Sequence, residues 1–352
     1  MPMLIPRWPL PLVAVLAFGQ EAPFPPEAGG SWRPAWELTL RGDRLSSPGY
    51  DADSFRRTDL QLRLRWAWES GGLRLEAGTR SALGSDGNRF NADRWDQQPS
   101  NGSQVDVAKG TYTWLSERAF GALTLGFQEN GLLAPQALWD RNLRFLGAGG
   151  RFGLRGSELV QEAGFRVAAG RVRDVLGGRV NLLAGQLVLK LDTGPWSWTA
   201  HADRWGLAWD AGSERLRQLP GHDPAMRQRM TVDAAGLSTV WHAALPVEAG
   251  WSGSRNRETG ETAEEAVLAL GSRQRVYWPQ LALTWQRLSS TGTLYPVNGD
   301  EWWYYRRARG PRADLALPLP GRWIATLVLL RQRLDGADET VNRTMLVLQK
   351  RF

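Results

Sequence analysis

The sequence predicts an all-β fold: a transmembrane, antiparallel, up-and-down β-barrel of about 16 strands, within a range of about 14–18. Three observations predict it. Apolar and polar residues alternate with period two in one run after another. The connections between these runs alternate between short turns and long polar loops. The chain of 352 residues also carries 19 tryptophans, many of which fall near predicted strand ends.

The first residues, "MPMLIPRWPLPLVAVLAFGQEAP", predict a secretory signal peptide over residues 1–19. Arg7 precedes an apolar run, and Ala17 and Gly19 place small residues where a signal peptidase inspects the chain. Prolines within the run weaken the alternative of a buried helix. We expect cleavage after Gly19, a short periplasmic segment over 20–31, and the barrel over 32–352.

Alternation is clearest in "DLQLRLRWAW", and it recurs in "ALTLGF", "PWSWTAHAD" and "PQLALTWQ". In the first run the apolar residues share one parity and the polar residues share the other. Because successive side chains of a strand point to opposite faces, each run predicts a strand with one apolar and one polar face. The apolar set is Leu60, Leu62, Leu64, Trp66 and Trp68, and the polar set is Gln61, Arg63 and Arg65.

The connections supply the strand count. Short turns are expected near 69–72, 116–120, 156–160, 192–195, 242–246, 272–279 and 317–321. Longer polar loops are expected near 42–56, 83–103, 129–143, 206–226, 255–263 and 289–300, with shorter ones near 173–179 and 335–340. This pattern implies sixteen strands, with both chain ends on the short-turn side. Within 228–250 the alternation is expected to shift phase around Gly236.

A bilayer explains why such strands would close into a barrel. Every backbone N–H and C=O group in the hydrocarbon must pair within the protein, and a sheet without edges achieves this. The outer face must then be apolar, while the inner face can be polar. Tryptophans at strand ends are typical of the aromatic belts at membrane interfaces. Prolines such as Pro195, Pro279 and Pro318 fall at strand ends or turns, where no ladder hydrogen bond is lost.

The last strand, "VNRTMLVLQKRF", places Leu346, Leu348 and Phe352 on one parity. It resembles the C-terminal signature of bacterial outer-membrane proteins, which end on an aromatic residue after alternating apolar positions. The resemblance implies that these three residues form the signal read by the barrel-assembly machinery, with periplasmic chaperones as further partners. Lys350 departs from the signature, and its side chain could reach the interface by snorkelling.

Over the whole mature chain the pattern resembles porin-like outer-membrane proteins of Gram-negative bacteria, including anion-selective and alginate-export porins. Sixteen strands leave an open lumen. The resemblance implies a loop folded inward to constrict it, and "ENGLLAPQALWDRNLRFLG" is the candidate because it is unusually apolar. Its candidate residues are Leu133, Trp139, Asp140 and Arg141. The alternative is an external loop with a short helical turn.

Charge suggests what would line that lumen. The net charge is +7, and the arginines are spread along the chain, which fits nucleic-acid binding poorly. Inward arginines would favour anions. The alternative is that they pair with inward acids, first of all Arg74 with Glu76 and Arg312 with Asp314. Strand parity predicts these pore-lining residues: Arg63, Arg65, Arg74, Glu76, Arg80, Arg151, Arg166, Asp203, Arg306 and Arg312, with Arg229 also inward.

The stretch "EWWYYRRARGPRADLAL" breaks the pattern, because its parity turns Arg307 and Arg309 toward lipid. A bulge at Gly310–Pro311 would reset the register, and this is the preferred interpretation. The alternative is that these arginines lie at the level of lipopolysaccharide and bind its phosphates.

These observations favour a passive outer-membrane channel for small hydrophilic solutes, preferring anions, in contact with the bilayer and lipopolysaccharide. A homotrimer is implied by resemblance only. Alternatives are a selective channel for phosphate, organic acids or acidic polysaccharide, a non-conducting anchoring barrel, and a hydrolase at the rim using His201 or His222. No cofactor, metal site or nucleic-acid partner is predicted. The chain has no cysteine, which excludes disulfides and thiolate metal sites.

Overall fold

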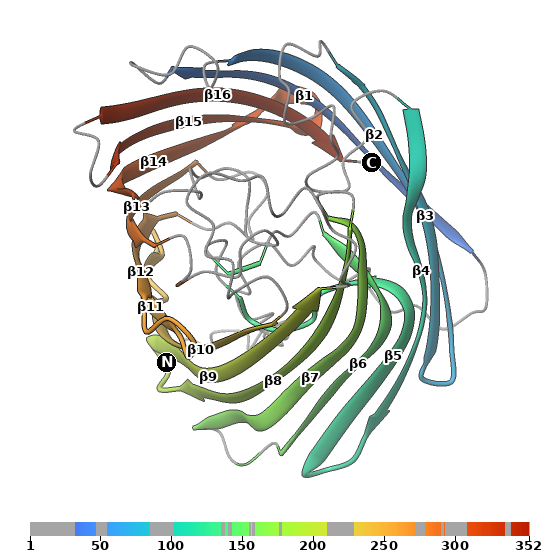
Figure 1. Ribbon diagram of the computed structural model, residues 1–352. Helices are drawn as coiled ribbons and strands as arrows, with labels where there is room; N and C mark the ends of the chain where they lie inside the picture. Colours follow the sequence, from blue (N-terminus) through green and yellow to red (C-terminus); the bar gives the residue numbers. More distant parts are fainter. Residues whose placement is uncertain are drawn as a thin grey trace, which may run out of the picture.

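The computed structural model describes residues 32–46, 55–84, 102–134, 138–139, 143–154, 156, 159–175, 178–209, 229–271, 279–289, 292, 308–334 and 339–351. They form one closed antiparallel barrel of sixteen strands, seen along its axis in Figure 1. The strands are β1 (Arg33–Ser46), β2 (Phe55–Ser70), β3 (Leu73–Gly84), β4 (Gly102–Leu115), β5 (Ala119–Glu129), β6 (Arg144–Leu154), β7 (Val160–Val175), β8 (Gly178–Asp192), β9 (Trp196–Trp209), β10 (Arg229–Trp241), β11 (Val247–Asn256), β12 (Thr262–Leu270), β13 (Gln280–Leu288), β14 (Ala308–Leu319), β15 (Trp323–Leu334) and β16 (Glu339–Arg351).

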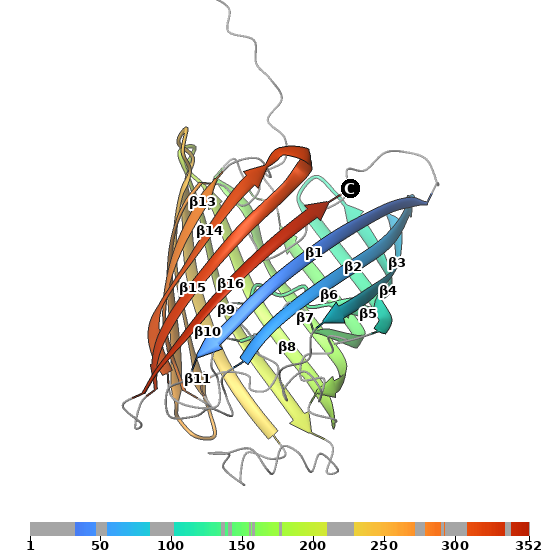
Figure 2. The same cartoon turned by 90° about the horizontal axis from the view of Figure 1, so that it is seen from above.

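Each strand pairs with its neighbours in sequence, and β1 pairs with β16 to close the ring. The predicted all-β barrel of about 16 strands is therefore confirmed. Figure 2 shows how strongly the strands tilt against the barrel axis. We call the end that carries the β2–β3, β4–β5 and equivalent connections the turn end, and the opposite end the loop end. Among the described residues, no helix is long and apolar enough to cross a membrane.

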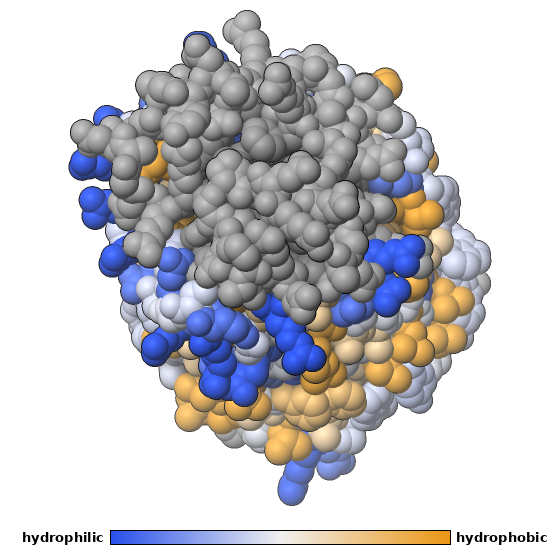
Figure 3. All heavy atoms as spheres, viewed as in Figure 1, coloured by the Kyte–Doolittle hydropathy of each residue, from blue (hydrophilic) through white to orange (hydrophobic). Residues whose placement is uncertain are grey.

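The two faces of the wall differ as the alternation predicts. Along β13, Leu281, Leu283 and Trp285 are exposed on the outer face, while Ala282 and Thr284 are buried on the inner face. Tryptophans gather on the outer face near the turn end, where Trp196 stacks on both Trp198 and Trp241. Figure 3 shows hydrophobic surface on the outer wall beside separate groups of hydrophilic residues.

The expected bulge at Gly310–Pro311 is wrong. Arg309 pairs with Arg333 and Arg312 pairs with Leu330, so the register between β14 and β15 is the same on both sides of the proline. The pairing with β13 is also continuous through Gly310 and Pro311. Arg309 therefore lies exposed on the outer face. The missing N–H of Pro311 removes one ladder bond without inserting a residue.

The assignment of Arg229 to the inner face is also wrong, and so is the phase shift near Gly236. Strand β10 pairs with β9 in one unbroken register from Arg229 to Trp241. Met230 and Val232 are buried on the inner face, so Arg229 is exposed on the outer face. Polarity is reversed here because the inner wall packs against an apolar segment, as described below.

Irregularity occurs elsewhere. The β3–β4 register shifts between Gly78 and Thr79, which leaves Asp106 and Val107 both buried on adjacent positions of β4. On β5, Gly126 has φ of 125°, and a Cβ atom there would lie 2.2 Å from the carbonyl oxygen of Ala108. Only glycine fits that close approach without strain.

Several expectations lie outside the described residues. They concern the signal peptide and the segment over 20–31, the constriction candidates Asp140 and Arg141, and the pore-lining candidate Arg306. The loop histidine His222 and the terminal Phe352 also fall outside. Of the other assembly-signal residues, Leu346 lies on the outer face and pairs with Leu327 of β15, and Leu348 pairs with Ala325. Near the turn end, the ammonium of Lys350 lies 5.4 Å from the centroid of the Trp323 ring.

Candidate functional site

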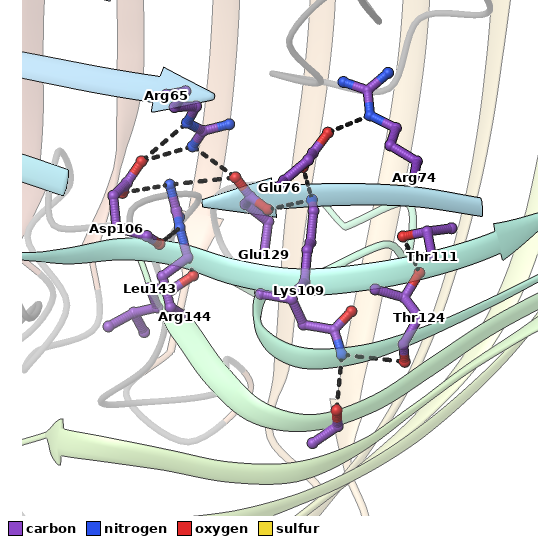
Figure 4. A network of polar contacts seen from close by, with 12 residues as sticks. Arg65, Arg74, Glu76, Asp106, Lys109, Thr111, Thr124, Glu129, Leu143 and Arg144 are labelled. Carbon is purple, nitrogen blue, oxygen red and sulfur yellow. Dashed lines mark hydrogen bonds and ion pairs between the residues drawn. The ribbon is translucent and has the colours of Figure 1, made fainter. Parts of the chain in front are cut away.

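The inner wall over β2–β6 carries a network of charged side chains (Figure 4). At its centre, the fully buried carboxylate of Asp106 accepts hydrogen bonds from Arg65 at 2.7 Å and from Arg144 at 3.1 Å. Arg63 and Arg80 lie close enough to interact with Asp106 electrostatically. One buried acid is thus surrounded by four arginines. Hydrogen bonds from charged groups offset the free energy of hydration that the carboxylate loses on burial.

The network continues along the wall through Glu129. Its carboxylate accepts hydrogen bonds from Arg65 at 2.6 Å and from Lys109 at 2.8 Å. Lys109 also pairs with Glu76 at 2.9 Å, and Arg74 donates to Glu76 at 2.5 Å. The expected Arg74–Glu76 pair is therefore present, as Figure 4 shows, within a chain of alternating charges rather than in isolation.

A second cluster lies near the turn end, on β6, β7 and β8. Glu162 is bound by Arg151 at 2.7 Å, by Lys190 at 2.8 Å and by Arg166 at 3.3 Å. The side chain of Glu162 is 4% exposed, whereas that of Arg151 is 46% exposed. Arg166 and Lys190 are nearly as buried as the carboxylate, so Arg151 is the exposed cation of this cluster.

A third cluster lies at the seam between β1 and β16. Asp43 accepts hydrogen bonds from Arg343 at 2.6 Å and from Arg41 at 2.9 Å, and its side chain has no exposed surface. Nearby on β14, Arg312 donates to Asp314 at 2.9 Å, so the other expected pair is also present.

These clusters share one arrangement. In each of the three, one carboxylate that is at most 4% exposed binds two or more cations. Around each of these carboxylates the positive groups outnumber the acid on the wall that faces the space inside the barrel. The arrangement can attract anions into that space, since a low-dielectric wall strengthens the field of the excess charge.

The neighbouring wall, over the loop-end parts of β7–β10, is apolar on its inner face. We call the connection between β5 and β6 the β5–β6 loop (residues 130–143), and its described residues Leu132, Leu138, Trp139 and Leu143 pack against the strands there. Trp139 is 4% exposed, and its ring stacks on that of Trp205 with centroids 5.9 Å apart. It also meets the edge of Phe145 at 6.5 Å. The buried cluster further includes Leu132, Leu138, Leu143, Val172, Leu182, Leu207, Met230 and Val232.

Hydrogen bonds join the same loop to the wall at Leu133. The side-chain amide of Gln186 donates to the carbonyl oxygen of Leu133 at 2.7 Å, and its oxygen accepts from the N–H of Leu133 at 2.9 Å. The amide of Gln186 also donates to Asp203 at 2.8 Å. A wall side chain thus satisfies both backbone groups of one loop residue, which a buried loop requires.

His201 and Asp203 lie within hydrogen-bonding distance, with His201 Nδ1 at 2.9 Å from Asp203 Oδ1. Asp203 accepts from Gln186 with the same oxygen atom, so this carboxylate takes part in the contact between wall and loop. This pair supports a structural role for Asp203 rather than catalysis. Within the described ranges, no group of three or more His, Asp or Glu residues could hold a metal ion.

The structure brings most of the pore-lining candidates together. Arg63, Arg65, Arg74, Glu76 and Arg80 belong to the β2–β6 network, and Arg151 and Arg166 belong to the Glu162 cluster. Sequence analysis missed the acids Asp106, Glu129 and Asp43 and the cations Lys109, Arg144 and Arg343. Strand parity alone could have found Asp43, because Arg41 and Asp43 share a face of β1.

Comparison with known proteins identifies the fold. No protein-family model matches the sequence, and no curated protein sequence is significantly similar to it. The solved structure of OprB from Pseudomonas putida is similar over 92% of this chain and 94% of its own, with a TM-score of 0.60 and 7% identity. OpdO from Pseudomonas aeruginosa is similar over 91% of this chain and 97% of its own, with a TM-score of 0.51 and 11% identity. The chain has the fold of porin-like outer-membrane barrels.

Proposed function

We propose that this chain is a porin, a channel of the Gram-negative outer membrane through which small hydrophilic solutes diffuse, with a preference for anions. The observation that carries the proposal is the set of cation-rich clusters on the inner face. In the Glu162 cluster three cations meet one acid, and the most exposed member of that cluster is Arg151. A solute passing this cluster would meet the guanidinium group of Arg151 before the carboxylate of Glu162.

The positions of the clusters support general diffusion over selection at a single level. Asp106 and Asp43 lie in the loop-end halves of β4 and β1, whereas Glu162 lies at the turn end of β7. An anion would therefore encounter positive charge at both ends of its path. A selective channel for phosphate, organic acids or acidic polysaccharide remains the second candidate, and its cargo would be bound by the same arginines.

The β5–β6 loop is the constriction in this proposal. Trp139 and Leu133 hold the described part of the loop against the inner wall of β7–β10, so the loop occupies part of the interior. The free path then lies on the side of the β2–β6 network, where the charged groups are. Firm packing of the loop also supports the alternative of a non-conducting barrel, and conductance separates the two.

The test is the reversal potential of the refolded barrel in a planar bilayer under a KCl gradient. We expect a steady conductance with chloride preference. Arg151→Ala should reduce that preference, because it removes the most exposed cation of the Glu162 cluster. Arg204→Ala is the matched control, since Arg204 lies on the outer face with 61% of its side chain exposed.

The possible outcomes are distinct. A preference for cations would refute the proposed anion preference but would still support a channel. A folded barrel without conductance would favour the anchoring alternative. Cleavage after Gly19, the partners in assembly and a homotrimer also remain part of the proposal. They are tested by sequencing the mature N-terminus, by depleting the assembly machinery, and by measuring the mass of the native complex.

A further inference from the structure

On the described strands, the arginines of the outer face lie toward the loop end. Among the described strand side chains, every outward arginine lies in the half of its strand that leads to a loop. Examples are Arg44, Arg171, Arg204 and Arg255 on β1, β7, β9 and β11. The turn half of the outer face carries tryptophans instead. This asymmetry indicates that the two membrane interfaces offer different chemistry to the barrel.

The arginines are densest on β13, β14 and β15. Arg287 pairs in register with Arg309, and Arg309 pairs with Arg333, so three cations lie side by side across neighbouring strands. All three are exposed. Glu264 of β12 pairs with Arg287 and is the acid at the end of this arginine row. Like charges on directly opposite residues repel each other. An anion bound between them is attracted by each of the cations and offsets this repulsion.

A groove lies on the outer wall directly next to the arginine row, toward the turn end. It has a volume of about 670 Å³ and crosses β12–β16. Leu268, Leu283, Ala313 and Leu329 supply apolar walls, and Trp285 lies at the edge next to Arg287. The lining is mostly apolar. Small side chains such as Ala313 lie between larger ones, which leaves room for the groove.

Arg331 connects the two features. It lines the groove and lies two residues before Arg333 on the same face of β15. An arginine at the edge of an apolar groove can reach both a headgroup and the first part of a hydrocarbon chain. From the loop end toward the membrane centre, the outer face thus presents first the arginine row, then Trp285 and then the apolar groove.

We propose that the outer face of β12–β16 is a binding site for a phosphorylated, acylated lipid of the extracellular leaflet. The phosphate lies against Arg287, Arg309 and Arg333, and an acyl chain lies in the groove beside Leu283 and Leu329. Guanidinium groups suit this role because they bind phosphate in a bidentate manner. The inference goes beyond transport, since it assigns a ligand to the outside of the barrel.

A lipid fits this surface better than a second copy of the chain. A second copy would have to bury the arginine row against an outer wall whose described loop-end cations are also arginines, such as Arg171 and Arg204. Bringing cations together in this way opposes association. A phosphorylated lipid supplies the opposite charge and the hydrocarbon in one molecule.

The experiment measures binding of diphosphorylated lipid A to the purified, folded barrel by native mass spectrometry. The test variant is Arg287→Gln/Arg309→Gln/Arg333→Gln. The matched control is Arg171→Gln/Arg179→Gln/Arg229→Gln, which removes three exposed outer arginines of the loop end on β7, β8 and β10. Ala313→Trp fills the groove without changing the charge. Heat-modifiable migration in gels confirms that each variant is folded.

We expect the test variant to bind lipid A about tenfold more weakly, equivalent to about 1.4 kcal/mol, and the control variant to bind as the parent does. Dephosphorylated lipid A should bind the parent weakly, and Ala313→Trp should weaken binding of lipid A. Unchanged binding by the test variant, or an equal loss in the control, would overturn the proposal. The proposal would also be overturned if inorganic pyrophosphate competed with lipid A as strongly as lipid A itself and Ala313→Trp had no effect on binding. That result would describe a site for a free anion.

A separate measurement addresses the second copy. The chain has no native cysteine, so Leu283→Cys places a single thiol in the groove. Efficient disulfide-linked dimers of the barrel in the membrane would show that another copy covers this face, and would overturn the lipid site. Modification of the thiol by a bilayer-soluble reagent, slowed by lipid A in the parent arginine background, would support it.

Discussion

The two sides of the inner wall are built on opposite principles. Over β2–β6 the wall consists of linked ion pairs, with Asp106 and Glu129 bridging cations from different strands. Over the loop-end parts of β7–β10 it consists of aromatic and aliphatic side chains that pack against Trp139. In a barrel, an inner face is polar where it meets water and apolar where it meets a loop. The comparison shows that the polarity of an inward-facing side chain depends on what that side chain contacts inside the barrel. Polarity alone therefore does not establish which face of a strand points inward.

The largest expected effect breaks the apolar side. Trp139→Ala removes the ring that stacks on Trp205 and meets Phe145, and should destabilise docking of the β5–β6 loop by about 3–5 kcal/mol. The loop should then leave the wall, so single-channel conductance should rise and protease should cleave the loop faster. Trp251→Ala is the control, because Trp251 is 51% exposed on the outer face. Unaltered conductance would show that the loop does not restrict the path.

The next effect breaks the polar side. Arg144→Met leaves the buried carboxylate of Asp106 without one of its two hydrogen-bonded cations, and should lower the free energy of unfolding by about 3 kcal/mol. Urea unfolding in lipid vesicles measures it. Combining this change with Asp106→Leu should restore part of the loss, since the buried carboxylate that Arg144 no longer neutralises is then absent. A double variant as unstable as the sum of the two single variants would contradict the ion-pair account.

A smaller effect sharpens the boundary between the two sides. Gln186→Leu removes both hydrogen bonds to the backbone of Leu133 and replaces the amide with an apolar side chain of similar size. It should weaken loop docking by about 1–3 kcal/mol, because two buried backbone groups lose their partner. Channel noise should increase as the loop opens more often, with a smaller rise in mean conductance than in Trp139→Ala. Gln186→Glu keeps the acceptor for the Leu133 N–H but turns a carboxylate oxygen toward Leu133 O and Asp203, so it should weaken docking at least as much as Gln186→Leu.

The smallest effect concerns a pair outside both walls. Arg204 donates to Asp233 at 2.8 Å on the outer face, where the arginine side chain is 61% exposed. Arg204→Gln should change the free energy of unfolding by less than about 1 kcal/mol, since water and salt screen exposed ion pairs. Urea unfolding at low and high salt would measure it. A loss comparable to that of Arg144→Met would mean that lipid headgroups exclude water from this pair.

The sequence could predict what depends on neighbours two residues apart. The alternation along β13 and the pairs Arg74–Glu76 and Arg312–Asp314 follow from strand parity. Contacts that require the register of distant strands could not be predicted. Arg65 meets Glu129 across 64 positions, and Gln186 meets Leu133 across 53. The short turns could be located because glycine and polar residues mark them, and the apolar composition of residues 129–143 indicated a loop that folds inward.

Arg229 and Arg309 show two ways in which local pattern misleads. On β10 the apolar parity faces inward because Met230 and Val232 pack toward the β5–β6 loop. On β14 the sequence appeared to need a bulge, because charge on a lipid-facing position is unfavourable at the membrane centre. Arg309 is instead the second residue of β14 at the loop end, where charge is tolerated.

The seam has a consequence for how the chain is assembled. Asp43 on the first strand and Arg343 on the last are 300 positions apart, and they meet only when β1 pairs with β16. A slip of one residue at the closing pair would turn every side chain of that strand to the opposite face, placing a carboxylate against hydrocarbon. The Asp43–Arg343 contact therefore favours the observed frame at the closing pair, because it forms when β1 and β16 are paired in this register.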